Sequence, residues 1–187
     1  MRQGDSFLKF FIFILYFSSV FPFLSQQTTI YSENFSNQEN KGVNGVNNGS
    51  PIFDVTGINW SIDVSAASLT ASTDWFKVKN GVMEARDLDG LVYWISPDID
   101  IALYVDVLIQ LDASEQGNLE ASDVYTCEFS LDGGAWTQFE TNGSFSDDFT
   151  STTAQQTLLN GATIQIRVGM HNNAGNEYMR LDNVTVS

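Results

Sequence analysis

The sequence predicts an all-β fold, a two-sheet antiparallel β-sandwich of the jelly-roll type with about ten strands. Three observations lead to this fold. Apolar and polar residues alternate along most hydrophobic segments, turn-forming Gly, Asn, Asp and Ser residues separate those segments, and none shows a sustained 3.6-residue apolar period. Alternation is typical of half-buried strands, because successive side chains of a strand point to opposite faces of its sheet.

The expected strands follow one another at short spacing along the chain. They are residues 28–35, 58–64, 75–79, 82–87, 91–96, 105–111, 125–131, 135–139, 163–170 and 178–186. Most alternate, as in 163–170, where Ile164, Ile166 and Val168 share one face and Gln165 and Arg167 share the other. The segment 91–96 is apolar throughout and ends before Pro97. First and last strands of such sandwiches often lie side by side, so Glu33 and Asp182 are expected near one sheet edge.

Two hairpins are indicated by their turn residues. Asn80-Gly81 separates strands 75–79 and 82–87, and both residues accept the positive φ that a type I′ turn requires. Asp132-Gly133-Gly134 allows strand 125–131 to turn back into 135–139. Between strands 105–111 and 125–131 we expect an acidic loop, 112–123. Its four carboxylates, with no basic residue among them, are either solvated or share a cation.

The N-terminus has the pattern of a secretory signal peptide. Arg2 and Lys9 precede an uncharged apolar run, 10–24, and the small residue Ser25 stands where a peptidase would cut. The run is shorter than the roughly 20 apolar residues of a membrane span, and it contains Pro22. We therefore expect a cleaved segment, 1–25, followed by a single domain, 26–187, that is secreted, periplasmic or cell-surface and has no membrane span.

The chain is strongly acidic. Removing 1–25 takes away two of eight basic residues and one of 23 acidic residues, so the net charge becomes 6 − 22 = −16. Such a surface repels phosphate backbones, which argues against direct binding of nucleic acid. The charge is compatible with neutral glycans, with cations, or with solubility alone.

Catalytic signatures are sparse. The single cysteine, Cys127, lies on the apolar face of its strand and is expected to be a buried hydrophobe. His171 is the only histidine, and the sequence has no G-x-S-x-G, H-E-x-x-H or P-loop motif. Paired carboxylates of a sandwich glycosidase remain an alternative, but pairs are easily found among so many acids. We therefore predict no catalytic residues.

Four sequence features, taken in order, resemble a known group of modules. They are ENF at 33–35, ISPDIDI at 95–101, FSLDGGAWTQF at 129–139 and LDNVTV at 181–186. Together they look like jelly-roll modules related to concanavalin A-like lectins, MAM domains and carbohydrate-binding modules. The runs at 74–90 and 173–178 further resemble modules of secreted Bacteroidetes-type proteins, which often accompany nucleases, other hydrolases or adhesins.

The resemblance implies a structural calcium ion. In related modules, an acidic residue of the first strand and the Asp of the closing strand help to hold the ion, and Glu33 and Asp182 match those positions. Calcium requires six to eight oxygens, so Asp63 and the D-x-D-G acids Asp87 and Asp89 are the further candidates. The alternative is that these carboxylates are solvated or belong to turns.

For a ligand, aromatic rings that stack on sugars are the leading candidates. We expect Trp75, Trp94, Tyr93, Tyr178 and the cation Arg86 to line the binding surface, although core or rim packing is the alternative for each. The sequence thus predicts a secreted non-catalytic module that binds a polysaccharide or other glycan. The alternatives are an accessory domain of a larger secreted nuclease or hydrolase, with a catalytic domain in a longer homologous chain, and an adhesin-type protein-interaction module.

Overall fold

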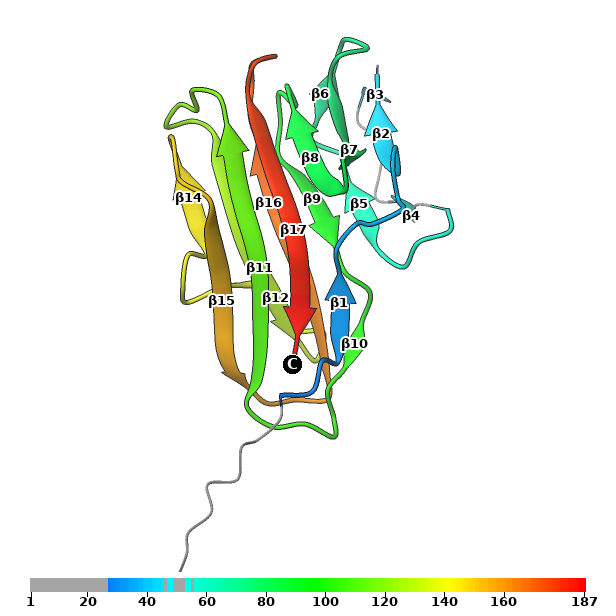
Figure 1. Ribbon diagram of the computed structural model, residues 1–187, viewed down its shortest axis with the longest axis vertical. Coiled ribbons are helices and arrows are strands. Elements are labelled where there is room, and N and C mark those ends of the chain that lie inside the picture. The colour runs from blue at the N-terminus through cyan, green and yellow to red at the C-terminus, as the bar shows by residue number, and fades with distance from the viewer. Residues whose placement is uncertain (1–26, 46, 49–52, 55) are drawn as a thin grey trace, which may run out of the picture.

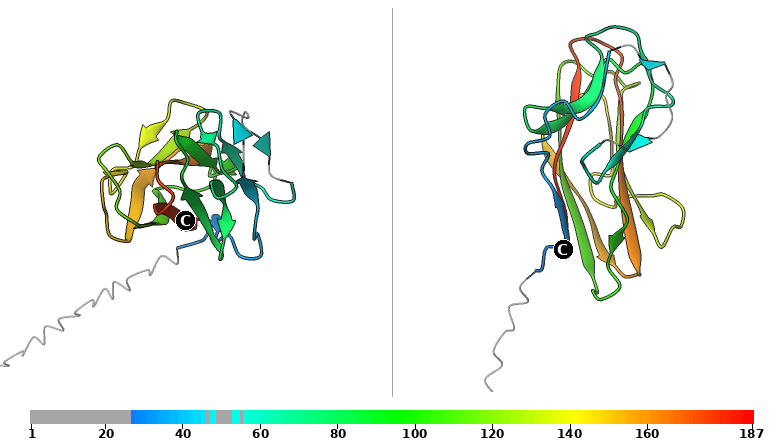
Figure 2. Two further views of the ribbon diagram at one scale, coloured as in Figure 1. Left: turned by 90° about the horizontal axis from the view of Figure 1, so that it is seen from above. Right: turned by 90° about the vertical axis from the view of Figure 1, so that its right-hand side faces the viewer.

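The computed structural model describes residues 27–45, 47–48, 53–54 and 56–187. The described residues form two antiparallel β-sheets packed face to face (Figures 1 and 2), and the fold is therefore an all-β sandwich. None of these residues belongs to a helix that is long and apolar enough to cross a membrane. The predicted signal peptide, 1–25, lies outside the described residues.

One sheet has seven strands and contains the C-terminal strand. Its order is β15 (Thr152–Leu159), β11 (Val107–Gln116), β17 (Tyr178–Val186), β8 (Val82–Arg86), β7 (Trp75–Lys79) and β2 (Gly42–Asn44), with β1 (Tyr31–Glu33) also paired to β17. The pairing of Tyr31 with Val186 confirms that the first and last predicted strands lie side by side.

The other sheet has eight strands. Its order is β13 (Thr137–Gln138), β12 (Val124–Leu131), β16 (Thr163–His171), β9 (Val92–Ile95), β5 (Ser61–Asp63) and β4 (Phe53–Asp54), while β10 (Ile99–Asp100) pairs with β16 and β14 (Ser144–Ser146) with β12. A separate two-stranded ribbon joins β3 (Asn47–Asn48) to β6 (Ser68–Leu69).

Four connections cross between the sheets at the end of the sandwich opposite the C-terminus (Figure 1). They join β8 to β9, β11 to β12, β16 to β17 and β14 to β15. The second is closely packed against the third, because a Cβ on Gly117 would lie 2.7 Å from the carbonyl oxygen of Asn176. The β14–β15 connection is bonded to the second, because Asp148 Oδ1 accepts the N–H of Leu119 at 2.7 Å, and the crossing loops therefore form one packed end of the molecule.

The core lies between the two sheets and is built from the apolar face of each alternating strand. Its largest rings are Trp60, Trp94 and Tyr125, followed by Phe35, all buried. Phe35 meets both indoles edge-on, with ring centroids 6.1 Å from Trp60 and 5.9 Å from Trp94. Cys127 is also buried, as expected, and burial raises the pKa of its thiol far above the ordinary value. A thiol in this state is a packing group.

The strand predictions were most accurate where alternation was regular, as in β7, β16 and β17. Asn80 (φ 53°) and Gly81 (φ 79°) form the predicted turn with both residues at positive φ. The predicted acidic loop at 112–123 was too long, because β11 continues to Gln116. Strand β15 was missed, since its sequence TTAQQTLL is rich in Thr and Gln and carries few apolar residues at period two.

The buried indole of Trp94 allows a direct test of the core. Trp94→Ala removes a ring with no exposed surface and leaves a cavity, so unfolding should become easier by about 3–5 kcal/mol. Urea denaturation followed by circular dichroism measures this change. The matched change Trp136→Ala, at a half-buried ring on the outer face, should cost much less. Equal denaturation midpoints for Trp94→Ala and the unchanged protein would contradict the packing described here.

Candidate functional site

A hollow of about 270 Å³ opens on the outer face of the eight-stranded sheet. Alternation on β5, β9 and β16 directs every second side chain away from the core into this face. Trp136, from the turn that follows β12, closes one side of it. The lining residues are Ser61, Asp63, Tyr93, Ile95, Trp136, Gln165 and Arg167.

Arg167 is the fixed centre of this pocket. Its Nε donates to Glu128 Oε2 at 2.7 Å and its Nη2 donates to Glu128 Oε1 at 3.1 Å, so the two charges neutralise each other across β16 and β12. The guanidinium carbon lies 4.4 Å from the centroid of Tyr93 and 4.5 Å from that of Trp136. A bidentate pair orients the guanidinium, and cation–π contact then positions both rings.

Gly169 lets the ring of Tyr93 lie close to β16. The two residues are paired across β9 and β16, and a Cβ on Gly169 would lie 2.9 Å from Tyr93 Cε1 and 2.5 Å from Thr126 Oγ1. Any side chain at position 169 would therefore displace Tyr93. The glycine thus helps to shape the wall of the pocket.

The pocket presents polar groups that have unused hydrogen-bonding capacity. The hydroxyl of Tyr93 and the indole N–H of Trp136 have no partner within the described part of the chain. Asp63 uses Oδ1 to accept the N–H of Ser65 at 2.9 Å, and Gln165 uses Nε2 to donate to the carbonyl of Ser96 at 3.1 Å. Burial raises the pKa of Tyr93, so its hydroxyl keeps its proton at neutral pH. The pocket can therefore both donate and accept hydrogen bonds.

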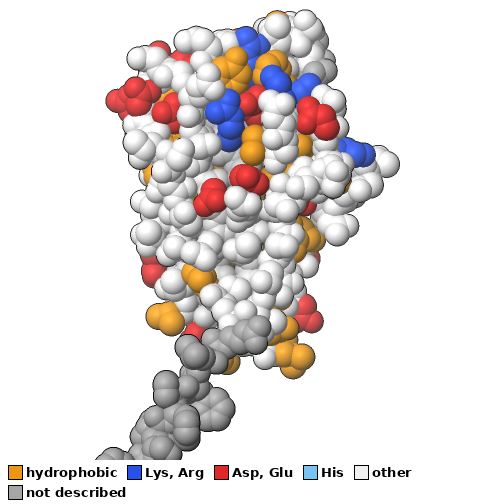
Figure 3. Space-filling model, in the orientation of Figure 1, with side chains coloured by type: hydrophobic (Ala, Val, Ile, Leu, Met, Phe, Trp, Pro, Cys, Tyr) orange, Lys and Arg blue, Asp and Glu red, His pale blue; other side chains and the backbone are white. Residues whose placement is uncertain are grey.

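A second group of aromatic and basic side chains lies on the outer face of the seven-stranded sheet. Trp75 and Tyr178 come within 6.3 Å between ring centroids, and Arg86 lies 4.8 Å from the first and 5.8 Å from the second. Lys79 lies 4.1 Å from the Trp75 centroid and Arg180 5.4 Å from that of Tyr178. Figure 3 shows the Lys and Arg side chains gathered at this upper part of the face, among apolar ones.

The two arginines on this face are already held by the protein itself. Arg86 donates from Nε to the carbonyl of Gly175 at 2.8 Å, and Nη1 donates to the carbonyl of Thr73. Arg180 pairs with the buried Glu84 at 2.7 Å, and Glu84 also accepts the indole N–H of Trp75 at 3.1 Å. Cationic side chains cover the Trp75 ring, and the N–H groups of both arginines are bonded within the protein. This surface therefore serves mainly to hold β7, β8 and β17 together.

The structure divides the predicted ligand residues among three places. Trp75, Tyr178 and Arg86 meet on the seven-stranded sheet, while Tyr93 lines the pocket on the other sheet. The prediction for Trp94 is wrong, because its ring is fully buried and points into the core, opposite to that of Tyr93. Trp136 and Arg167 were missed. The position of Arg167 on the polar face of an alternating strand was the available signal for it.

The five predicted metal ligands do not form one site. Glu33 and Asp182 lie near each other through the β1–β17 pairing, Asp87 and Asp89 lie in the β8–β9 crossing, and Asp63 lies in the pocket on the other sheet. Among the described residues, one set of three acidic side chains has ligand atoms within 4.8 Å of one another, and it contains none of these five.

The pair Glu33 and Asp182, which the family resemblance implied for calcium, already accepts hydrogen bonds from protein donors. Glu33 accepts the N–H of Phe35 at 2.6 Å and both amide contacts of Gln38 Nε2, at 3.0 and 3.1 Å. Asp182 accepts the N–H of Asn183 at 2.8 Å. Protein N–H groups therefore bond three of the four carboxylate oxygens of this pair.

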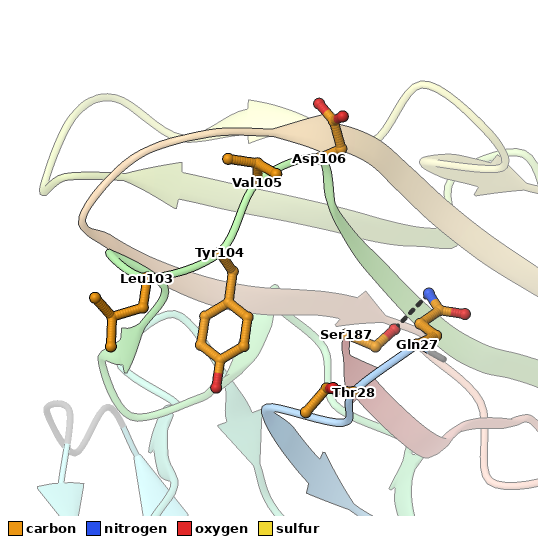
Figure 4. A pocket seen from close by; sticks show the side chains of 7 residues that line it. All are labelled: Gln27, Thr28, Leu103, Tyr104, Val105, Asp106 and Ser187. Atoms are coloured by element: carbon orange, nitrogen blue, oxygen red, sulfur yellow. Dashed lines mark hydrogen bonds between the residues drawn. The ribbon is translucent and has the colours of Figure 1, made fainter. Parts of the chain in front are cut away.

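The end of the sandwich where the C-terminus lies carries an exposed apolar loop, in the connection between β10 and β11. Leu103 and Val105 are 93% and 78% exposed, beside a shallow hollow that Gln27, Asp106 and Ser187 also line (Figure 4). Gln27 donates to the hydroxyl of Ser187 at 2.7 Å and closes the edge of this hollow. Apolar tips of this kind suit contact with another protein.

Comparison with known proteins gives a loose structural likeness. No family model and no curated protein sequence matches the chain. Among solved structures, the K3 adhesin domain of Lys-gingipain from Porphyromonas gingivalis is 11% identical over 86% of this chain and 99% of that domain, with a TM-score of 0.47.

Two carbohydrate-binding modules show a similar likeness. TmCBM61, solved with β-1,4-galactotriose, is 10% identical over 75% of this chain and 90% of its own, with a TM-score of 0.41. The family 30 module of a Clostridium thermocellum cellulosomal cellulase is 10% identical over 85% and 95%, with a TM-score of 0.34. At these identities and TM-scores the likeness carries no weight for the ligand of this chain.

Replacing Asp182, one of the acidic pair near β1, is expected to raise the thermal stability of the protein in a pH-dependent way. Burial, and then the charges of Asp112 and Glu33, raise the pKa of Asp182 above its ordinary 3.8. The folded state therefore favours the protonated form, and stability is lost as pH rises from about 4 through the folded-state pKa. Asp182→Asn should melt roughly 1–3 °C higher at pH 7 in chelator, with the difference closing below pH 4.

Thermal melts of both proteins across this pH range provide the measurement. Asn keeps the side-chain oxygen that accepts the N–H of Asn183, so the comparison isolates the charge. A lower midpoint for Asp182→Asn at pH 7 would mean that the carboxylate makes a favourable contact in the folded protein. The inference that Asp112 and Glu33 repel it would then be wrong.

Proposed function

We propose that this chain is a secreted, non-catalytic binding module that holds a neutral glycan in the pocket formed by Tyr93, Trp136 and Arg167. One observation carries the proposal. Two aromatic rings flank a concave site whose remaining lining, apart from Ile95, is polar and retains free hydrogen-bonding capacity. Sugar rings present apolar C–H faces to aromatic side chains and hydroxyls to planar polar groups, so the chemistry of the pocket matches theirs.

The size of the pocket favours a short stretch of sugar chain. Small-molecule sites usually enclose about 300–1,000 Å³, so a hollow of about 270 Å³ holds roughly one sugar residue. Residues on either side would continue along the outer face of the sheet. The pocket thus suits an internal or terminal residue of a glycan better than a large compact ligand.

Charge favours a neutral glycan over an acidic one. Arg167 is the one cation lining the pocket, and its charge is neutralised by the bidentate contact with Glu128. Asp63 adds a negative charge on the same side. Since the whole chain carries a formal net charge of −15, polyuronates and sulfated glycans would be repelled at long range.

The same arrangement disfavours glycoside hydrolysis in this pocket. Glycosidases use two carboxyl groups, one as acid and one as base or nucleophile. Asp63 is the one carboxylate among the residues that line this pocket, and the nearby Glu128 is committed to Arg167. We therefore propose a binding role, either by this module alone or as an accessory to a catalytic domain in a longer homologous chain.

The exposed apolar loop between β10 and β11 favours the adhesin-type alternative. Leu103 and Val105, in the connection between β10 and β11, would make its protein contact, and neither of them lines the pocket. Replacing both by Ser should leave glycan binding intact if the pocket is the site. Loss of glycan binding in Leu103→Ser/Val105→Ser, with an unchanged melt, would transfer the ligand site to this loop.

Single aromatic changes in the pocket test the proposed function. Trp136→Ala and Tyr93→Ala should each weaken binding of a neutral oligosaccharide by about tenfold or more, because each loses one stacking face. Affinity electrophoresis in gels that contain soluble polysaccharides identifies the ligand, and calorimetry then gives the dissociation constants. The circular dichroism spectrum of each variant should remain that of the unchanged protein.

The braced surface on the other sheet supplies the matched control. Trp75→Ala removes an aromatic ring of the same type from the seven-stranded sheet and should leave the dissociation constant within about twofold. If Trp75→Ala abolishes binding while Trp136→Ala does not, the ligand lies on the seven-stranded sheet and the pocket assignment is wrong. If neither neutral nor acidic glycans bind, the proposed function itself fails.

A further inference from the structure

Three carboxylates meet at the end of the sandwich where the chain crosses between its sheets. Glu120 and Asp123 come from the β11–β12 crossing, and Glu177 lies at the end of the β16–β17 crossing. One oxygen of each lies within 4.8 Å of the others. Asp123 and Glu177 are buried, whereas Glu120 is exposed. Like charges held this close in a partly dry site repel one another unless a cation joins them.

One oxygen of Asp123 has no hydrogen-bond partner. Its Oδ2 accepts the N–H of Glu120 at 2.9 Å, but the buried Oδ1 has no donor within the described part of the chain. His171 Nδ1 stands 3.9 Å away, beyond hydrogen-bonding distance, and is already 3.0 Å from the carbonyl oxygen of Ser122. A fully buried carboxylate oxygen is costly without a partner, so its isolation points to a missing ligand.

A second orphaned oxygen belongs to Asn172. Its Nδ2 donates to the carbonyls of Glu177 at 3.0 Å and Ala85 at 3.4 Å, while its buried Oδ1 is unpartnered. Val124 pairs with His171, so Asp123, which precedes β12, and Asn172, which follows β16, lie next to the last paired residues at the same end of the two strands. The hydrogen bond from Nδ2 to the carbonyl of Glu177 also ties the Asn172 side chain to the third carboxylate residue. The amide oxygen therefore belongs to the same end of the sandwich as the carboxylates.

The electrostatics of Glu177 agree with this geometry. Burial, followed by the charges of Asp123 and Glu120, raises the pKa of its carboxyl group, and two backbone N–H groups offset the rise in part. Among the described residues, no Arg or Lys side chain forms an ion pair with any of the three carboxylates. The cluster therefore has a surplus of negative charge that the described residues leave uncompensated, apart from the single imidazole of His171.

We propose that Glu120, Asp123 and Glu177, with the side-chain oxygen of Asn172, hold one calcium ion. Calcium takes six to eight oxygens at 2.3–2.6 Å, so two ligands on opposite sides of the ion are about 5 Å apart. Three carboxylate oxygens within 4.8 Å of one another fit this sphere. Water would complete it on the exposed side of Glu120. Magnesium requires a smaller, nearly octahedral arrangement and is expected to bind more weakly.

The ion would join loops that are distant in sequence. Glu120 and Asp123 belong to one crossing loop and Glu177 to another, and Gly117 already packs against the second loop. Asn172 links the same point to β8 and to the β8–β9 crossing, because its backbone carbonyl accepts the N–H groups of Leu88 and Asp89 at 2.9 and 3.1 Å. Calcium would therefore stabilise the packed end as a unit, at a place distinct from the sugar pocket.

The test is calcium binding by the chelator-treated protein. Calorimetry should show one ion per chain, and about 5 mM calcium should raise the thermal midpoint by roughly 3–8 °C, as expected for an extracellular module with a dissociation constant near 10⁻⁴–10⁻³ M. Asp123→Asn/Glu177→Gln should lose both effects. Glu120→Gln, at an exposed side chain that the fold does not need, should weaken binding about tenfold without lowering the midpoint in chelator, because it removes one of the repelling charges.

The matched control carries Glu33→Gln and Asp182→Asn, at the acidic pair on β1 and β17. This control should bind calcium with the same affinity as the unchanged protein. The proposal is overturned if calcium neither binds nor shifts the melt, if Glu120→Gln binds it normally, or if the control loses binding. Equal affinity for magnesium and calcium would also contradict the proposed ligand sphere.

Discussion

The buried Asn172 joins two of the crossing loops on which the sandwich depends, those between β8 and β9 and between β16 and β17. Its carbonyl accepts two N–H groups from the β8–β9 crossing, and its amide donates to the carbonyls of Ala85 and Glu177. Strands β8 and β17 of one sheet, and β16 of the other, are thereby tied at one residue. A sandwich whose chain repeatedly changes sheets must satisfy the backbone groups of each crossing, since those groups leave the ladders that paired them. Asn172 pairs several of these backbone groups through its own hydrogen bonds. Its side-chain Oδ1 has no partner in the described structure, and a bound cation would supply one.

Much of the fold could be predicted from the sequence because alternation is a local property. Strands such as β7, β16 and β17 show it plainly, and the turn at Asn80-Gly81 is encoded by two adjacent residues. Strand β15 was missed because its pairing with β11, rather than its own pattern, makes it a strand. The sequence also placed Trp94 at the surface, although alternation along β9 directs Tyr93 outward and Trp94 inward. In an uninterrupted apolar strand, the composition alone does not distinguish the two faces.

The candidate sites were harder to predict because they are assembled by register between distant segments. Arg167 meets Glu128 only because β16 and β12 pair in one alignment, and Trp136 reaches the same guanidinium from a turn. Likewise, the acidic loop suggested a shared cation, but Glu177 joins Glu120 and Asp123 from a loop more than 50 residues further along. A register shifted by one residue would turn each of these side chains to the other face.

The two aromatic–cation groups of this protein show why contact geometry, and not residue type, separates a brace from a binding site. On the seven-stranded sheet, Lys79 and Arg86 lie over Trp75, and the arginine is held by backbone carbonyls, so a ligand would have to displace contacts that already exist. On the eight-stranded sheet, Arg167 also lies over Tyr93 and Trp136 and is held by Glu128, but the hydroxyl of Tyr93 and the indole N–H of Trp136 stay available beside a hollow. A ligand bound in this pocket can form hydrogen bonds without displacing contacts within the protein. Its binding free energy is therefore more favourable than on the seven-stranded sheet, and the pocket is the favoured site of recognition.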